Sequence, residues 1–108
     1  MRRLRALHTA AILLALPVTC FAWSGSATGS VTRIDVTADG NYGVRVYLGN
    51  QVMCGAGTPQ WAYLNDSDSN FNVYVSALLA AKADGDTVIL YTDIDSSGNC
   101  HIGYISVQ

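Results

Sequence analysis

The strongest structural signal in the chain is the segment Phe71-Asn-Val-Tyr-Val-Ser-Ala-Leu-Leu-Ala-Ala-Lys-Ala-Asp-Gly-Asp-Thr-Val-Ile-Leu90. In its first half, apolar side chains recur at positions i, i+4, i+7 and i+8 of one helical face: Phe71, Val75, Leu78 and Leu79. Gly85 then suits the left-handed turn that ends a helix. The run from Thr87 to Asp93 is apolar on both faces, which predicts a central strand. The segment therefore predicts one amphipathic helix that leads directly into a buried strand.

Three shorter strands are expected before this helix. Residues Val31 to Val36 alternate between two faces, and Tyr42 to Leu48 alternate again after the turn signal Asp39-Gly40, so these two strands form an antiparallel hairpin. Trp61 to Leu64 is short, aromatic and β-prone. The Gly/Ser-rich stretch from Trp23 to Ser30 predicts an irregular lead-in to the first strand.

The chain after the helix supplies two strands. The first is the segment that follows Gly85, and the second is His101 to Val107, after a polar turn from Asp95 to Asn99. The expected order is β-β-β-α-β-β, a mainly β fold with one helix. This is the order of the OB-fold, a small Greek-key barrel. We see no repeat and no dividing linker, so residues 23–108 are expected to form a single small domain.

The first 22 residues have the composition of a secretory signal peptide. Met1-Arg-Arg-Leu-Arg5 is cationic, Ala10 to Val18 is apolar, and Thr19-Cys-Phe-Ala22 ends in a small residue. We expect cleavage near Ala22 and Trp23, and a secreted or periplasmic product. Two alternatives stay open. One is an uncleaved membrane anchor, although the apolar stretch is shorter than the ~20 residues needed to span a bilayer, and the other is lipidation at Cys20.

Removal of this leader changes the charge balance of the chain. The full sequence has six basic and eight acidic residues, and three of the basic ones leave with residues 1–22. The eight aspartates then face only Arg33, Arg45 and Lys82, which gives a net charge of −5. Such a surface repels phosphate backbones and anionic lipids. We therefore expect no nucleic-acid partner, and no membrane association after cleavage.

The cysteines predict a disulfide in the mature domain. Cys20 leaves with the leader, so Cys54 and Cys100 remain as an even pair in an oxidising compartment. A domain of this size has a modest core, and a disulfide is then a large share of its stability. The alternatives are a redox pair or a metal site. The two cysteines lie far apart, and with His101 they fall short of a four-ligand set, so we predict no metal and no cofactor.

One motif imitates a calcium loop. Asp93-Ile-Asp-Ser-Ser-Gly98 has the D-x-D-x-S-G opening of such a loop, in which closely spaced oxygens suit a hard cation. The twelfth position should be a bidentate glutamate and is Tyr104 instead. The favoured interpretation is a polar hairpin turn.

His101 is the residue best suited to acid–base chemistry. It has the chemistry of a general base, and Asp35, Asp93 and Asp95 are candidate partners. No nucleophile motif accompanies it, and Cys54 is expected to be oxidised. We therefore predict no catalytic residues.

Aromatic residues are numerous for so small a domain. They are Trp23, Tyr42, Tyr47, Trp61, Tyr63, Tyr74, Tyr91 and Tyr104. Rings with Asp, Asn and Ser side chains nearby are the materials of sugar recognition and of protein interfaces. The alternative is that most of them fill the core and the sheet faces.

Several anchors resemble a known family. Trp23-Ser-Gly25, a hairpin, Cys54, and a helix that opens with Phe71 and leads into Val88-Ile-Leu90 are similar to the B subunits of subtilase cytotoxin and typhoid toxin. Those subunits open with Trp-Thr-Gly and carry a Phe-led helix before a Thr-Gly-Gln-x-Val strand entry. The resemblance implies an OB-fold that forms a ring of five and binds sialylated glycans in a shallow pocket. It also implies a sugar-contacting serine, for which Ser30 is the candidate.

Together, these patterns predict an exported, non-enzymatic binding module whose ligand is a glycan or another protein. The alternative is a small periplasmic structural or accessory protein that assembles with itself. A homo-oligomer is compatible with both.

Overall fold

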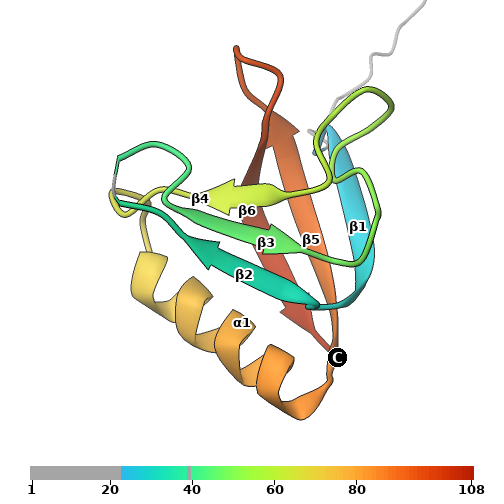
Figure 1. Ribbon diagram of the computed structural model, residues 1–108, viewed down its shortest axis with the longest axis vertical. Coiled ribbons are helices and arrows are strands. Elements are labelled where there is room, and N and C mark those ends of the chain that lie inside the picture. Colours follow the sequence, from blue (N-terminus) through green and yellow to red (C-terminus); the bar gives the residue numbers. More distant parts are fainter. Residues whose placement is uncertain (1–22, 39) are drawn as a thin grey trace, which may run out of the picture.

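A computed structural model describes residues 23–38 and 40–108 (Figure 1). The predicted signal peptide, residues 1–22, lies outside the described residues. In chain order the elements are β1 (Gly25–Ser30), β2 (Arg33–Val36), β3 (Val44–Tyr47), β4 (Ala62–Leu64), α1 (Phe71–Asp84), β5 (Thr87–Ile94) and β6 (Cys100–Val107). The fold is mainly β with one helix, as predicted. Within the described part of the chain, no helix combines the length and the apolar character needed to cross a membrane.

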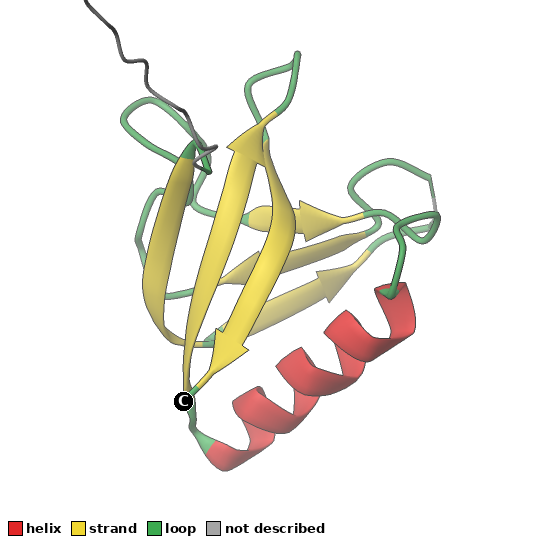
Figure 2. Ribbon diagram, turned by 180° about the vertical axis from the view of Figure 1, so that it is seen from behind, coloured by secondary structure: helices red, strands yellow, loops and turns green. Residues whose placement is uncertain are grey.

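The strands form one curled sheet with the order β1-β5-β6-β4-β3-β2. β1 and β2 are its two edges, yet only Val31 and Thr32 separate them in the sequence, so the chain itself connects one edge to the other. β4 and β6 pair in parallel, and the other neighbours are antiparallel. Figures 1 and 2 show β2, β3 and β4 on one side, β1, β5 and β6 on the other, and α1 across one end. This is the architecture of a small OB-fold-like barrel.

The expectation of an irregular lead-in from Trp23 to Ser30 is wrong. Gly25–Ser30 is β1, and it pairs with β5 along its whole length. Ala27 faces the core, whereas Ser26, Thr28 and Ser30 are exposed. Small and hydroxyl side chains on an outer strand face give almost none of the apolar alternation from which a strand is recognised. The expected first strand, Val31 to Val36, corresponds to β2 alone, and β1 is an additional strand that the sequence did not predict.

The helix ends where the sequence predicts. Gly85 follows the last turn with a φ of 73°, and its N–H donates to the Ala81 carbonyl. The predicted buried face is correct for Leu78, which is fully buried, and wrong for Leu79, which is 52% exposed. The stripe that packs on the barrel consists of Phe71, Tyr74, Val75, Leu78 and Ala81. Leu79 lies on the flank of this stripe because the barrel end covers only a narrow strip of the helix.

A disulfide joins Cys54, in the loop between β3 and β4, to Cys100, the first residue of β6. It confirms the predicted pairing, and both cysteines belong to the buried core. Two further contacts meet at the same loop. The Thr92 hydroxyl donates to the Met53 carbonyl at 2.8 Å, and a Cβ atom on Gly25 would lie only 2.6 Å from the Cys54 Cα. The loop, the start of β1, and strands β5 and β6 are therefore tied together at one place.

Removal of the disulfide by Cys54→Ser with Cys100→Ser is expected to lower the free energy of unfolding by about 2–5 kcal/mol, because the unfolded chain regains the entropy of an open loop. Urea unfolding with and without reductant measures this. The double variant should be insensitive to reductant, and the reduced wild type should unfold at the same midpoint as the variant. Equal midpoints for the variant and the oxidised wild type would contradict a structural role for the bond.

Candidate functional site

The outer surface of the barrel carries two groups of aromatic side chains. Outward and inward side chains alternate along each strand, so residues between core positions project from the sheet. We call Trp23, Ser26, Tyr91 and Tyr104, on or next to β1, β5 and β6, the aromatic platform. We call Arg33, Arg45, Tyr47 and Trp61, on or next to β2, β3 and β4, the arginine face.

The aromatic platform depends on a glycine. Gly103 is the extra residue of a bulge in β6, and the indole of Trp23 lies where a side chain on Gly103 would be. Tyr104 packs edge-on against Tyr91 with the ring centroids 5.2 Å apart. Trp23 is 42% exposed and Tyr104 is 54% exposed. Trp23 and Tyr91, together with Ser26, line a hollow of about 310 Å³.

Ser24, between two residues that line this hollow, is hydrogen-bonded to the end of β5. The backbone N–H of Ser24 donates to the Asp93 carboxylate at 3.3 Å, and the Ser24 hydroxyl accepts from the Ile94 N–H at 3.2 Å. The basic residues among those described lie elsewhere: Arg33 on β2, Arg45 on β3 and Lys82 on α1. The rim of the platform therefore combines hydroxyls with one carboxylate.

Ser30 lies on the same outer face of β1 as Ser26, at the other end of the strand. Ser26 is paired with Tyr91, whereas Ser30 is paired with Thr87, the first residue of β5. Four residues of extended strand place the two serines about 13 Å apart. The structure thus puts the candidate sugar-contacting serine on the platform side of the barrel, although not next to the rings.

The arginine face has a different geometry, because a guanidinium group covers each ring. The Arg45 guanidinium lies 4.5 Å from the centroid of Trp61, and that of Arg33 lies 4.5 Å from the centroid of Tyr47. Arg33 also donates two hydrogen bonds to Asp35, at 2.9 and 2.8 Å. The hydrogen bond from Arg33 holds the pKa of the Asp35 carboxyl below its ordinary value.

A polar hollow adjoins the arginine face at the end of β3. It measures about 420 Å³, and its lining includes Arg33, Tyr47, Asn50 and Gln60. The side chains of Asn50 and Gln60 are exposed. Their carboxamides offer both donors and acceptors beside the stacked guanidinium of Arg33.

A buried tyrosine lies behind the other end of the arginine face. The Tyr63 hydroxyl donates to the Asp95 carboxylate at 2.7 Å, and its ring stacks on His101 with centroids 4.7 Å apart. Burial, and then the hydrogen bond to Asp95, raise the pKa of the Tyr63 phenol. Tyr42 closes the cluster with an edge-on contact to Tyr63. The phenol is therefore held neutral, as an anchor of the sheet.

His101 has a carboxylate partner, but not one of those considered from the sequence. Its Nε2 lies 2.8 Å from Asp68 Oδ2, in the turn before α1, rather than next to Asp35, Asp93 or Asp95. The Asp68 carboxylate also accepts the Asn65 N–H at 2.8 Å, which ties the turn together. The pair joins β6 to the entrance of the helix. Asp68 orients the His101 imidazole, but no hydroxyl or thiol nucleophile among the described residues is hydrogen-bonded to His101.

The calcium-like motif forms a closed turn. Asp95 Oδ1 accepts the N–H groups of Ser97 and Asn99, at 2.8 and 2.9 Å, and Oδ2 accepts the Tyr63 hydroxyl. Burial acts to raise the pKa of Asp95, but these hydrogen bonds outweigh it and hold the pKa below its ordinary value. Among the described residues, no three His, Cys, Asp or Glu side chains are grouped to hold a metal ion. The oxygens of Asp95 are used to shape the hairpin.

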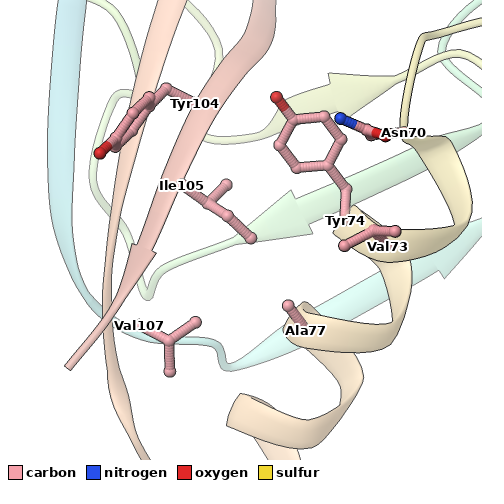
Figure 3. Close-up of a pocket in the computed structure, with 7 residues that line it drawn as sticks. All are labelled: Asn70, Val73, Tyr74, Ala77, Tyr104, Ile105 and Val107. Atoms are coloured by element: carbon pink, nitrogen blue, oxygen red, sulfur yellow. The ribbon is translucent and has the colours of Figure 1, made fainter.

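A cleft separates the helix from β6 (Figure 3). Val73, Tyr74 and Ala77 of α1 line one side and Ile105 and Val107 of β6 the other, around a volume of about 330 Å³. The Tyr74 hydroxyl crosses the cleft and donates to the Gly103 carbonyl at 2.9 Å. The cleft is thus apolar, and a single hydrogen bond spans its upper end.

Comparison with known protein families, with curated proteins and with solved structures finds no match. The resemblance to the toxin B subunits stays a prediction that these comparisons do not test.

Sequence reasoning missed the residues that give each surface its shape. The position of Ser26 on a strand could not be predicted because β1 has no apolar alternation, and Gly103 has no side chain to suggest a role. The pairing of Arg45 with Trp61 depends on the register of β3 and β4, which places residues from two strands side by side. The arginines offered a signal for this face, because the only two arginines after residue 22, Arg33 and Arg45, fall on the two strands of the predicted hairpin.

The Asp95 hydrogen bonds predict an acid limit to stability. Because the folded pKa of Asp95 lies below its ordinary value of 3.8, its contribution is complete above that pH and is lost as the pH falls through the folded value. Asp95→Asn should therefore lower Tm by a few degrees at pH 7 and flatten the fall in Tm below pH 4. Thermal unfolding from pH 7 to pH 2 measures both effects.

The matched control for this experiment is Asp35→Asn. Asp35 also has a lowered pKa, but it forms an exposed ion pair, so its loss should change Tm at pH 7 by little. An Asp95→Asn variant with the same Tm as the wild type at every pH would show that the turn does not need the carboxylate.

Proposed function

We propose that this chain is an exported, non-enzymatic binding module that binds a glycan on the aromatic platform. The observation that supports this most directly is the open face of Trp23. The indole is held against Gly103 and remains 42% exposed, beside Ser26 and Tyr91. A flat ring held in one position offers an apolar surface to the face of a sugar ring at little entropic cost.

The chemistry around the rings favours a sugar at this site. The hollow of about 310 Å³ is at the lower end of the size range of small-ligand sites. The Ser26 hydroxyl and the nearby Asp93 carboxylate suit the hydroxyl groups of a sugar. At the arginine face, by contrast, guanidinium groups already cover Trp61 and Tyr47, so these ring faces are not free to stack.

Ser30 extends the proposed site along β1. Ser26, Thr28 and Ser30 are exposed at alternate positions of one strand, so they offer a row of hydroxyls that leads away from the rings. An oligosaccharide with one unit stacked on Trp23 follows this row toward Ser30. This arrangement supports the serine as a secondary contact.

Export of the module is supported by its cysteines and its leader. The disulfide between Cys54 and Cys100 is the kind of bond that persists in oxidising compartments, and the cationic and apolar start of the sequence fits a signal peptide.

A glycan array followed by titration of the best ligand tests the proposed function. Trp23→Ala is expected to weaken binding at least tenfold, about 1.4 kcal/mol, because the stacking surface is lost. Gly103→Ala should have a similar effect without removing any platform side chain, since its new methyl group displaces the indole. Lys82→Ala, on the exposed surface of α1, should bind like the wild type. An array with no ligand at millimolar protein, or a ligand unaffected by Trp23→Ala, would overturn the proposal.

A second candidate function, self-assembly, is favoured by the cleft between α1 and β6. Val73 is 67% exposed and Val107 is 43% exposed on its two sides. β4 pairs only with Cys100 and His101, so within the described residues the rest of β6 has no neighbouring strand on its α1 side. Apolar side chains next to an unpaired strand edge are features that promote association of protein chains.

Sedimentation velocity tests self-assembly. If copies associate through the cleft, the wild type should sediment as a defined oligomer, and Val73→Lys should shift it to a monomer because a charge is then buried in the contact. The same variant should keep its Tm and its glycan affinity. A wild type that is monomeric at high micromolar concentration would exclude this candidate.

A further inference from the structure

We infer that the arginine face is a second, separate recognition site, which binds a segment of a partner protein through one carboxylate side chain. It does not depend on the proposed glycan site, because the two groups of residues lie on opposite sides of the barrel. Figures 1 and 2 show β2, β3 and β4 on one side and β1, β5 and β6 on the other.

The distribution of positive charge is the first observation. The described residues include three basic side chains against an excess of aspartates, and two of the three lie together on β2 and β3. Each is stacked on an aromatic ring, Arg33 on Tyr47 and Arg45 on Trp61. Stacking holds the planar guanidinium in a preferred position, so less rotational freedom is lost when it binds a ligand.

The state of Arg45 is the second observation. Its Nε donates to the Tyr42 carbonyl at 3.3 Å, which leaves the terminal nitrogens of the fork for other partners. In residues 23–38 and 40–108, Arg33 forms an ion pair with Asp35, and Arg45 forms none. A guanidinium fork matches the two oxygens of a carboxylate, and this geometry makes the strongest hydrogen-bonded ion pairs.

The surrounding charge argues for a discrete carboxylate rather than a long polyanion. Asp35 pairs with Arg33 and lies opposite Arg45 in the register of β2 and β3, and Asp68 and Asp95 contact His101 and Tyr63 at the other end of the face. A nucleic acid or a heavily sulfated chain would meet these carboxylates as well as Arg45. A protein segment is able to place one carboxylate on Arg45 and neutral groups elsewhere.

The residue types and the adjoining hollow favour a protein partner. Tryptophan, tyrosine and arginine are the side chains that most often carry the binding energy of protein interfaces. The hollow of about 420 Å³ adds the carboxamides of Asn50 and Gln60, which are suited to the N–H and C=O groups of an extended peptide. The face also lies on β3 and β4, which correspond to the second and third strands of an OB-fold, the side on which such barrels commonly bind extended ligands.

The test is an NMR titration of the ¹⁵N-labelled protein with an acetylated and amidated hexapeptide that carries one glutamate among neutral residues. The Nε–Hε signals of Arg33 and Arg45 are assigned with single variants. This single-glutamate peptide is expected to shift the Arg45 signal in a saturable way, and hexaglutamate should bind no more tightly. Arg45→Gln should weaken binding at least tenfold, because it removes the fork and keeps the length of a polar side chain. Lys82→Gln, the same loss of charge on α1, should leave the affinity unchanged.

Several results would overturn the inference. One is the absence of any shift of the Arg45 signal at millimolar peptide. Another is tighter binding of a heparin hexasaccharide or of inorganic phosphate at the same signal, which would make the face a general anion site. A third is an equal loss of affinity in Arg45→Gln and Lys82→Gln, which would show that binding depends on net charge rather than on the position of Arg45. Thermal unfolding of each variant, with a Tm matching the wild type, separates lost binding from lost structure.

Discussion

The rest of the structure depends on the contacts at Cys54. Its sulfur is bonded to Cys100 at the start of β6, and its backbone leaves no room for a side chain on Gly25 at the start of β1. The neighbouring Met53 carbonyl accepts a hydrogen bond from the hydroxyl of Thr92, a polar side chain that is fully buried. A barrel of this size has few apolar residues with which to join its two sides. These contacts join β1, β5 and β6 to the loop that carries Asn50 and Gln60, so both outer surfaces depend on them.

Both surfaces follow from how a small barrel uses its aromatic residues. The core consists mainly of aliphatic side chains and cysteines, with Tyr63 as the buried aromatic ring. Phe71 and Tyr74 of α1 pack against this core. The rings on the outer face of the sheet differ in what covers them. Guanidinium groups lie on Trp61 and Tyr47, and the backbone of Gly103 lies behind Trp23. The group that lies on a ring determines which ligand the ring can bind. A bare ring stacks on an apolar ligand face, whereas a ring beneath a guanidinium presents a positive charge.

The sequence predicted features that depend on local chemistry. The helix beginning at Phe71 and ending before Gly85, the antiparallel pairing of β2 with β3, and the disulfide each rest on nearby residues or on a simple count. The failures involve tertiary context. β1 is a strand because β5 lies beside it, and Leu79 is exposed because the barrel end covers only a narrow stripe of the helix. The Arg45–Trp61 contact joins residues 16 positions apart, and only the register of β3 and β4 brings them together.

The polar groups that stabilise the fold already form hydrogen bonds within it, whereas those able to bind a ligand do not. Asp95 and His101 attract attention in the sequence, one in a calcium-like motif and the other as a general base. In the fold, both oxygens of Asp95 accept hydrogen bonds from Tyr63, Ser97 and Asn99, and one nitrogen of His101 is bonded to Asp68. A ligand competing for these groups has to replace bonds that the fold already makes, which costs most of what it gains. Among the described residues, the terminal nitrogens of Arg45 and the exposed face of Trp23 have no such hydrogen bonds, so a ligand that meets them adds contacts without breaking any.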